Sequence, residues 1–68
     1  MEPMDTLYNE REAAPQIGVK PSTLKQARHT GVLFGKPGPS FLKMGRTVRY
    51  KLSELVKFRE QFPHYQNT

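Results

Sequence analysis

The sequence contains no cysteine, so neither a disulfide bond nor a thiolate metal site can add to the stability of its core. It has no long apolar run, and its first residues lack the basic start and apolar middle of a signal peptide. These absences favour a protein of the reducing cytoplasm with no membrane association. With 68 residues, the chain has room for one small domain whose core is only marginally stabilising.

Acidic residues are missing from the middle of the chain. All six carboxylates lie before position 13 or after position 53, and the segment between carries only basic charge. The net charge is +5, and we expect this segment to project a positive potential. A well-solvated surface would explain the same charge, but a carboxylate-free stretch over most of a domain favours a nucleic-acid partner.

Patterns typical of catalysis or cofactor binding are also missing. His29 and His64 have no cysteine or acidic residue at metal-ligand spacing, and the carboxylates form no pair suited to acid–base chemistry. The segment GKPGPS (35–40) has neither the spacing nor the following helix of a phosphate-binding loop. We therefore expect no enzymatic activity, no metal and no cofactor.

A first helix is predicted over 10–17. Asn9 and Glu12 have the spacing of a capping box, in which each side chain accepts a hydrogen bond from the other residue's backbone N–H. Pro15 is unfavourable within this helix unless the backbone distorts. Gly18 can adopt the left-handed conformation that commonly ends a helix. The inward face would carry Ala13, Ala14 and Ile17.

A second helix is predicted over 21–30. Pro21 suits its first position, and Gly31 can end it. Leu24 and Ala27, three residues apart, lie on its predicted inward face. A helix, a glycine-containing turn and a second helix form the helix-turn-helix pattern, which also occurs outside DNA-binding proteins.

Beyond the second helix, residues 32–34 are apolar and are expected to anchor under the core, and 35–40 is expected to be an irregular loop. Ser53 is predicted to cap a third helix that Pro63 closes. Its apolar residues are Leu55, Val56, Phe58 and Phe62.

Residues 41–51 are predicted to form a β-hairpin with a three-residue turn at 45–47. This turn would gather four large side chains on the inward face, namely Leu42, Met44, Val48 and Tyr50. The outward face would carry Lys43, Arg49 and Lys51. A two-residue turn would mix apolar and basic side chains on each face, so the patterning favours the longer turn.

The expected fold is therefore α+β, a winged helix-turn-helix with three short helices and a two-stranded β-hairpin wing between the second and third helices. The domain is predicted to extend over 7–62, between flexible tails at 1–6 and 63–68.

The polar face of the second helix is the main candidate site. At about 14 Å long, the helix fits a major groove about 12 Å wide, where Gln can pair with adenine and Lys with guanine. The candidate base-reading residues are Ser22, Thr23, Lys25 and Gln26. The candidate phosphate contacts beside them are Lys20, Arg28 and His29. Any one of these residues could instead be ordinary polar surface.

The hairpin offers a second basic surface, made of Lys43, Arg46, Thr47, Arg49 and Lys51. An arginine at a narrow tip, such as Arg46, suits insertion into a minor groove, although contact with phosphates alone is an alternative. Charges on an exposed edge strand also prevent aggregation, which accounts for the strand residues but not for the tip.

Several short motifs occur in unbroken order over about 7–60. They are Glu12-Ala13-Ala14, Gly18-Val19, Ser22-Thr23-Leu24, Gly38-Pro39-Ser40-Phe41, Lys43-Met44-Gly45-Arg46-Thr47-Val48-Arg49-Tyr50 and Ser53-Glu54-Leu55. The order resembles the small winged helix-turn-helix proteins of the phage excisionase and AlpA-type regulator group, which are akin to MerR-type DNA-binding domains. The resemblance implies base recognition by Thr23, Lys25 and Gln26, and wing contacts by Arg46 and Arg49.

The same resemblance implies an excisionase, or recombination directionality factor, that binds and bends double-stranded DNA. Copies would bind cooperatively at adjacent sites and direct an integrase, a tyrosine or serine recombinase, toward excision in a bacterial or phage-infected cell. The alternative is a small transcriptional regulator of a phage or mobile element. More distant alternatives are a protein-interaction module and an RNA-binding protein.

Overall fold

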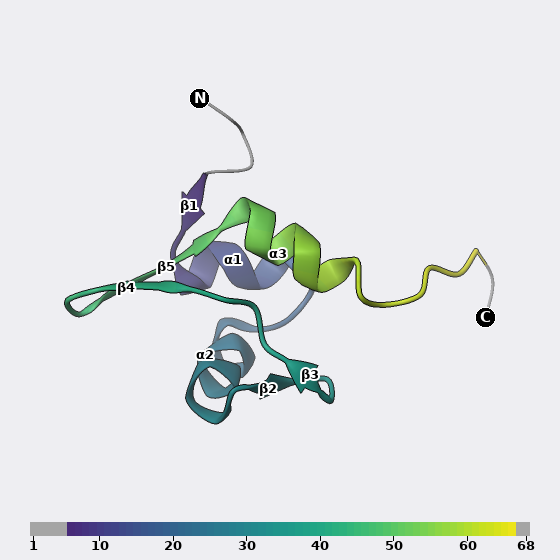
Figure 1. Cartoon of the computed structure of the whole chain (residues 1–68), viewed down its shortest axis with the longest axis horizontal. Coiled ribbons are helices and arrows are strands. Elements are labelled where there is room, and N and C mark those ends of the chain that lie inside the picture. Colours follow the sequence, from purple (N-terminus) through teal and green to yellow (C-terminus); the bar gives the residue numbers. More distant parts are fainter. Residues whose placement is uncertain (1–5, 67–68) are drawn as a thin grey trace.

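The computed structural model describes residues 6–66 (Figure 1). Residues 1–5 and 67–68, which belong to the two predicted tails, lie outside this description. The described part is a small α+β domain with three helices, as predicted, and with small antiparallel sheets. Its elements in chain order are β1 (Leu7–Tyr8), α1 (Glu10–Gln16), α2 (Pro21–Thr30), β2 (Val32–Leu33), β3 (Lys36–Pro37), β4 (Leu42–Met44), β5 (Thr47–Lys51) and α3 (Leu52–Arg59).

The start of α1 follows the predicted capping box. Asn9 Oδ1 accepts the backbone N–H of Glu12 at 2.8 Å, and Glu12 Oε1 accepts the backbone N–H of Asn9 at 3.0 Å. The helix ends at Gln16, one residue before the predicted end, and it contains Pro15. Gly18 follows with φ 72°, the left-handed conformation expected of it.

The bounds predicted for the second helix are confirmed. Pro21 occupies the first turn of α2, and Gly31 ends the helix with φ 83° while its N–H donates to the Ala27 carbonyl at 2.7 Å. Leu24 and Ala27 are buried, as their spacing predicted. This helix was predictable because its start, stop and apolar face are all specified within ten residues of sequence.

The prediction of an irregular loop over 35–40 is wrong for its first half. Lys36–Pro37 pairs with Val32–Leu33 in a second, two-stranded sheet. Pro37 has no N–H to donate, but an edge strand does not require one. The turn consists of Phe34 and Gly35, with φ values of 55° and 76°, and two positive values in succession are typical of a two-residue hairpin turn.

Only one of the three apolar residues at 32–34 anchors the core as predicted. Leu33 is buried, whereas Val32 is 54% exposed and Phe34 is 62% exposed. Strand pairing causes this outcome, because successive side chains of a strand point to opposite faces and the turn lies beyond both strands.

The predicted register of the main hairpin is also wrong. Lys43 lies opposite Val48 and Met44 opposite Thr47, so the turn has two residues, Gly45 and Arg46. Gly45 has φ 64° and Arg46 has no positive φ, which is the pattern of a type II′ turn and matches the twist of paired strands. The conformation of Gly45 is compatible with this two-residue turn, whereas side-chain patterning alone had predicted a longer one.

This register redistributes the side chains of the hairpin. Val48 and Tyr50 pack toward the core as predicted, but their face also carries Lys43, and the ring of Phe41 lies 6.0 Å from that of Tyr50. The opposite face carries Leu42, Met44, Thr47, Arg49 and Lys51. The predicted separation of apolar and basic faces is therefore not found.

The predicted two-stranded wing is part of a larger sheet. β1 pairs with β5, so the strand order is β1-β5-β4, and Tyr8 lies opposite Tyr50. The β2–β3 hairpin also lies between α2 and α3 in the chain, so two hairpins occupy a segment where one was predicted. Two-residue strands such as β1 carry too little periodicity to be recognised from sequence.

α3 begins before the residue predicted to cap it. Lys51 is the N-cap and makes no side-chain capping bond, and Ser53 lies inside the first turn. The backbone N–H of Leu52 donates to the carbonyl of Thr6 at 2.9 Å, so the residue just before β1 supplies the acceptor. The helix ends at Arg59, well before Pro63.

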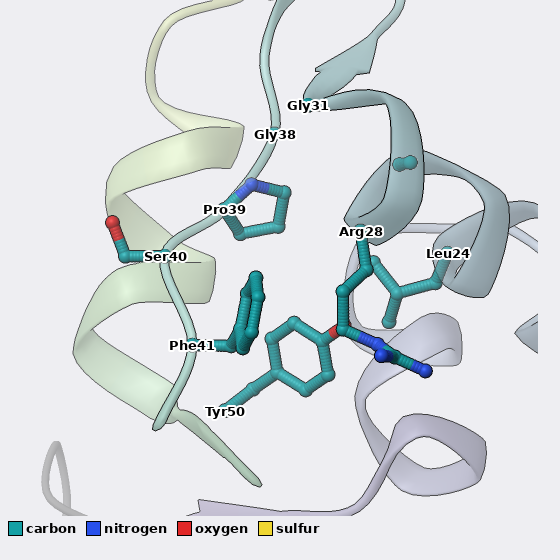
Figure 2. Close-up of a pocket in the computed structure, with 9 residues that line it drawn as sticks. Leu24, Arg28, Gly31, Gly38, Pro39, Ser40, Phe41 and Tyr50 are labelled. Atoms are coloured by element: carbon teal, nitrogen blue, oxygen red, sulfur yellow. The ribbon is translucent and has the colours of Figure 1, made fainter. Parts of the chain in front are cut away.

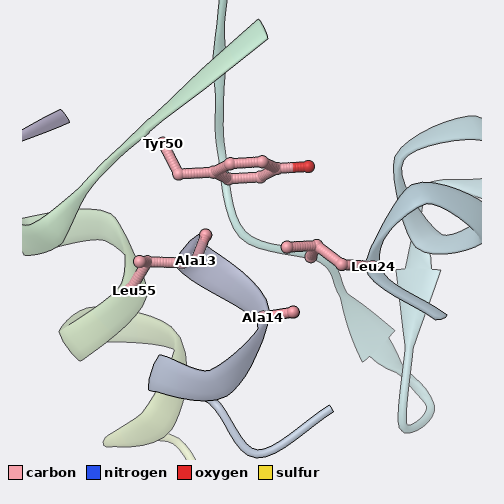
Figure 3. Close-up of a cluster of buried hydrophobic side chains, with 5 residues drawn as sticks. All are labelled: Ala13, Ala14, Leu24, Tyr50 and Leu55. Carbon is pink, nitrogen blue, oxygen red and sulfur yellow. The ribbon is translucent and has the colours of Figure 1, made fainter. Parts of the chain in front are cut away.

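α1 lies at the centre of the core (Figure 3). Its two fully buried alanines pack in a cluster with Leu24 of α2, Tyr50 of β5 and Leu55 of α3. A second cluster joins Ala27, Leu33 and Phe58. Because alanine side chains are small, α2, β5 and α3 approach α1 closely, and α1 thereby sets where the second helix and the hairpin lie.

Candidate nucleic-acid interface

One face of α2 is polar and free. Four polar side chains between positions 21 and 26 are exposed, while Leu24 and Ala27 are turned into the core. These four are the predicted base-reading residues Ser22, Thr23, Lys25 and Gln26. Within residues 6–66 their side chains have no hydrogen-bond or ion-pair partner, so the donors and acceptors of these side chains are available to a ligand.

The three predicted flanking contacts do not share one environment. Lys20 and His29 are exposed on either side of the polar face. Arg28 is different, because its Nε donates to Glu10 Oε2 at 2.7 Å and its Nη2 to Glu10 Oε1 at 3.3 Å. The side chains of Arg28 and Glu10 are only 17% and 21% exposed. A carboxylate thus neutralises one of the basic residues that the sequence had left without an acidic neighbour.

The carboxylate of Glu10 also binds a second partner, Tyr50. The hydroxyl of Tyr50 donates to Glu10 Oε2 at 2.9 Å, and the guanidinium carbon of Arg28 lies 6.0 Å from the centre of the Phe41 ring. Arg28 and Tyr50 are seen together in Figure 2. Sequence reasoning missed this cluster because Arg28 and Tyr50 lie 18 and 40 positions from Glu10, and no local pattern connects them.

The cluster shifts the protonation equilibria of its members. Burial raises the pKa of Glu10, but the hydrogen bonds from Arg28 and Tyr50 lower it by a larger amount. The net pKa of Glu10 therefore lies below the usual value. The pKa of Tyr50 is raised, first by burial and then by its hydrogen bond to Glu10. The pKa of Arg28 is raised chiefly by its hydrogen bonds to Glu10. Glu10 is therefore charged and Tyr50 neutral near neutral pH.

The β4–β5 hairpin extends beyond the helices, toward the left of Figure 1. Its predicted contacts Lys43, Arg46, Thr47 and Lys51 are exposed. Arg49 is half-buried, and its Nη1 donates to the Val48 carbonyl at 2.7 Å. By the observed register, Lys43 lies on the face opposite to Arg49 and Lys51, so basic side chains occupy both faces and the tip.

An open cavity of about 310 Å³ separates α2 from the segment that leads into β4 (Figure 2). Leu24, Ala27 and Arg28 line it from α2, and Pro39, Phe41 and Tyr50 line it from the other side. α2 therefore does not pack solidly against the hairpin on this side.

Within 6–66, no group of three or more histidine, cysteine, aspartate or glutamate side chains is placed to hold a metal ion. No helix in this range is long and apolar enough to cross a membrane.

Comparison of the sequence with protein-family models and with characterised proteins finds no significant match. The case for a function therefore comes from the residues of this chain and their placement.

Proposed function

We propose that this protein is a sequence-specific, double-stranded DNA-binding protein of the winged helix-turn-helix type. The observation that carries the proposal is the face of α2, where Lys25, Gln26 and two hydroxyl side chains are exposed above a buried apolar face. Among the described residues, these side chains have no hydrogen-bond or ion-pair partner. No acidic residue occurs on α2 or on the β4–β5 hairpin. Both surfaces are thus suited to a polyanion.

The dimensions of α2 agree with entry into a major groove. Its ten residues make a cylinder about 15 Å long, and the groove is about 12 Å wide. In this arrangement Gln26 can pair with adenine and Lys25 with the acceptors of guanine, while Ser22 and Thr23 bond base edges or phosphates. Lys20 and His29 flank these residues and suit phosphate contact.

The β4–β5 hairpin would act as the wing. Arg46 lies in its two-residue turn and is exposed, so the tip can reach the minor groove beside the major groove occupied by α2. The basic side chains on both hairpin faces suit the phosphates on either side of that groove. The alternative is a tip that contacts only phosphates.

For the biological role, we favour a recombination directionality factor that bends DNA and directs an integrase toward excision. The order of the motifs over about 7–60 supports this role through the excisionase resemblance. A single module of this size buries about 600–1,000 Å² on DNA, so specific binding would require adjacent copies or a partner already bound. Regulation of transcription is the second candidate, since the same resemblance extends to AlpA-type regulators.

The DNA-binding proposal is tested by selecting duplexes from a random-sequence library and measuring affinity for the selected site against salt concentration. Several phosphate contacts predict a log–log slope of about −4 to −7. A flat salt dependence, or a library that yields no preferred sequence, would overturn the proposal. Two further assays separate the biological roles. An increase in excision by a nearby-encoded integrase when the protein is added supports the recombination role, and repression of a reporter promoter supports transcriptional regulation.

A further inference from the structure

Three structural elements meet at the carboxylate of Glu10. Glu10 itself begins α1, Arg28 comes from the last turns of α2, and Tyr50 comes from β5. Both carboxylate oxygens are used, because Arg28 bonds both and Tyr50 bonds Oε2. One side chain of α1 thus connects the proposed DNA-reading helix to the proposed wing.

Direct packing of α2 on the hairpin is sparse, although Leu24 and Tyr50 share the core cluster around α1. α2 packs mainly on α1 and β2, and the open cavity of about 310 Å³ lies between α2 and Phe41 (Figure 2). Side chains that border an open space have no partners on that side to resist a change of angle. Beside the core cluster that Leu24 and Tyr50 share, the links across this region are the polar contacts at Glu10 and the position of Arg28 near the Phe41 ring.

The chemistry of these contacts is directional. A guanidinium that bonds both oxygens of a carboxylate is restricted in distance and in orientation, unlike an apolar contact. The ion pair also makes Arg28 unavailable to DNA phosphates, because its Nε lies 2.7 Å from Glu10 Oε2 and its side chain is mostly buried. The predicted phosphate contact by Arg28 would require this pair to break.

We propose that Glu10 is a positioning residue for DNA recognition: through Arg28 and Tyr50 it fixes the angle of α2 relative to the wing, and it withholds Arg28 from the phosphates. This inference rests on the proposed DNA-binding function. It assigns a role to an acidic residue in a protein whose other proposed contacts are basic or uncharged. Sequence preference, rather than overall attraction to DNA, is the property that depends on this residue.

The test compares Glu10→Gln and Arg28→Met with wild type on two probes, the duplex selected by wild type and a scrambled duplex. Each variant is measured at a temperature where circular dichroism shows it folded. We expect the ratio of the two affinities to fall about tenfold in both variants, the size of one lost base contact. The double variant should lose no more than either single variant, because both remove the same connection.

Salt dependence and a conservative variant separate positioning from direct contact. In Glu10→Gln the released Arg28 can reach a phosphate, so the magnitude of the log–log slope should increase by about 0.9, whereas Arg28→Met should leave it unchanged. Arg28→Lys keeps the charge but loses the two-pronged geometry, so it should not restore the affinity ratio. Glu60→Gln on an exposed site makes the same charge change and serves as the control.

Opposite results would overturn the inference. If Arg28→Met weakens binding to both duplexes equally and reduces the slope magnitude by about 0.9, while Arg28→Lys binds normally, Arg28 is a phosphate contact. An unchanged ratio of the two affinities in Glu10→Gln would also contradict the positioning role, while the proposed DNA binding would still stand. If the wild-type protein selects no preferred sequence, the proposed function is contradicted, and so is this inference, which rests on it.

Discussion

The hydroxyl of Tyr50 donates a hydrogen bond to the carboxylate of Glu10 at 2.9 Å, across 40 positions of sequence. The tyrosine is fully buried, and it fills the centre of the core beside the two alanines of α1. A buried hydroxyl without a partner would destabilise the fold, so this bond allows an aromatic side chain with a polar end to occupy the core. The same bond brings β5 to the start of α1.

Replacing Tyr50 with phenylalanine should lower the free energy of unfolding by about 1–2 kcal/mol, because a hydrogen bond to a charged acceptor is lost while ring packing is kept. Urea unfolding followed by far-UV circular dichroism measures the change. Tyr65→Phe is the matched control, since Tyr65 is 75% exposed and its change should stay within about 0.5 kcal/mol. Equal effects in the two variants would contradict a stabilising role for the bond.

The pKa of Glu10 predicts a specific response to acid. Because the pKa is lowered in the folded state, the carboxylate stabilises the fold fully above its unfolded value of 4.5, and the contribution is lost as pH falls through the folded pKa. The free-energy difference between wild type and Glu10→Gln should therefore be constant near neutral pH and shrink as the pH falls below 4.5. Urea titrations over this range measure it. A difference that persists undiminished in acid would show that another property of the side chain is responsible.

Leu24 connects the proposed reading helix to the core, and it is 1% exposed. Leu24→Ala should cost about 2–5 kcal/mol of unfolding free energy, a large share of what so small a domain has, and should leave much of the chain unfolded in circular dichroism. Met44→Ala is the control, since Met44 is 51% exposed on the hairpin and should change stability by about 0.5 kcal/mol or less. Comparable losses would mean that the register of the hairpin is not the one observed.

Two glycines should respond in opposite directions to alanine. Gly45 has φ 64° with open space around it, so Gly45→Ala should cost about 1–2 kcal/mol through backbone strain alone. Gly38 has no positive φ, and an added Cβ would meet the Ala27 Cβ at an ordinary 3.8 Å. Gly38→Ala should therefore be neutral or stabilise the fold by about 0.4–1 kcal/mol. Thermal unfolding measures both, and a neutral Gly45→Ala would contradict the two-residue turn.

The proposed division of work between helix and hairpin predicts two kinds of DNA-binding defect. Arg46→Ala should weaken binding to all duplexes alike and reduce the magnitude of the salt slope by about 0.9. Gln26→Ala should cost about 1–3 kcal/mol at one base pair and relax the preference there. Affinity measurements on the selected duplex and its single-base variants distinguish the two. Uniform losses from both substitutions would contradict the assigned roles.

Local signals explain what was predictable in the fold. Each of these signals acts within about one helical turn. The capping box of Asn9 and Glu12 predicts the observed start of α1. Pro21 and Gly31 predict the observed start and end of α2. The exposed candidate residues of α2 were predictable for the same reason, since helix periodicity turns them away from Leu24 and Ala27. The strands were harder, because β1, β2 and β3 have two residues each and carry almost no periodic pattern.

The sequence by itself determined the three helices, the polar face of α2 and the excess of basic charge, because neighbouring residues specify these features. The tertiary structure decided the hairpin register, the pairing of β1 with β5 and the partner of Arg28. Those outcomes depend on which residues, far apart in the sequence, come into contact in the fold. Glu10 illustrates the difference: in the sequence it is a carboxylate near one end, and in the fold it binds both Arg28 and Tyr50.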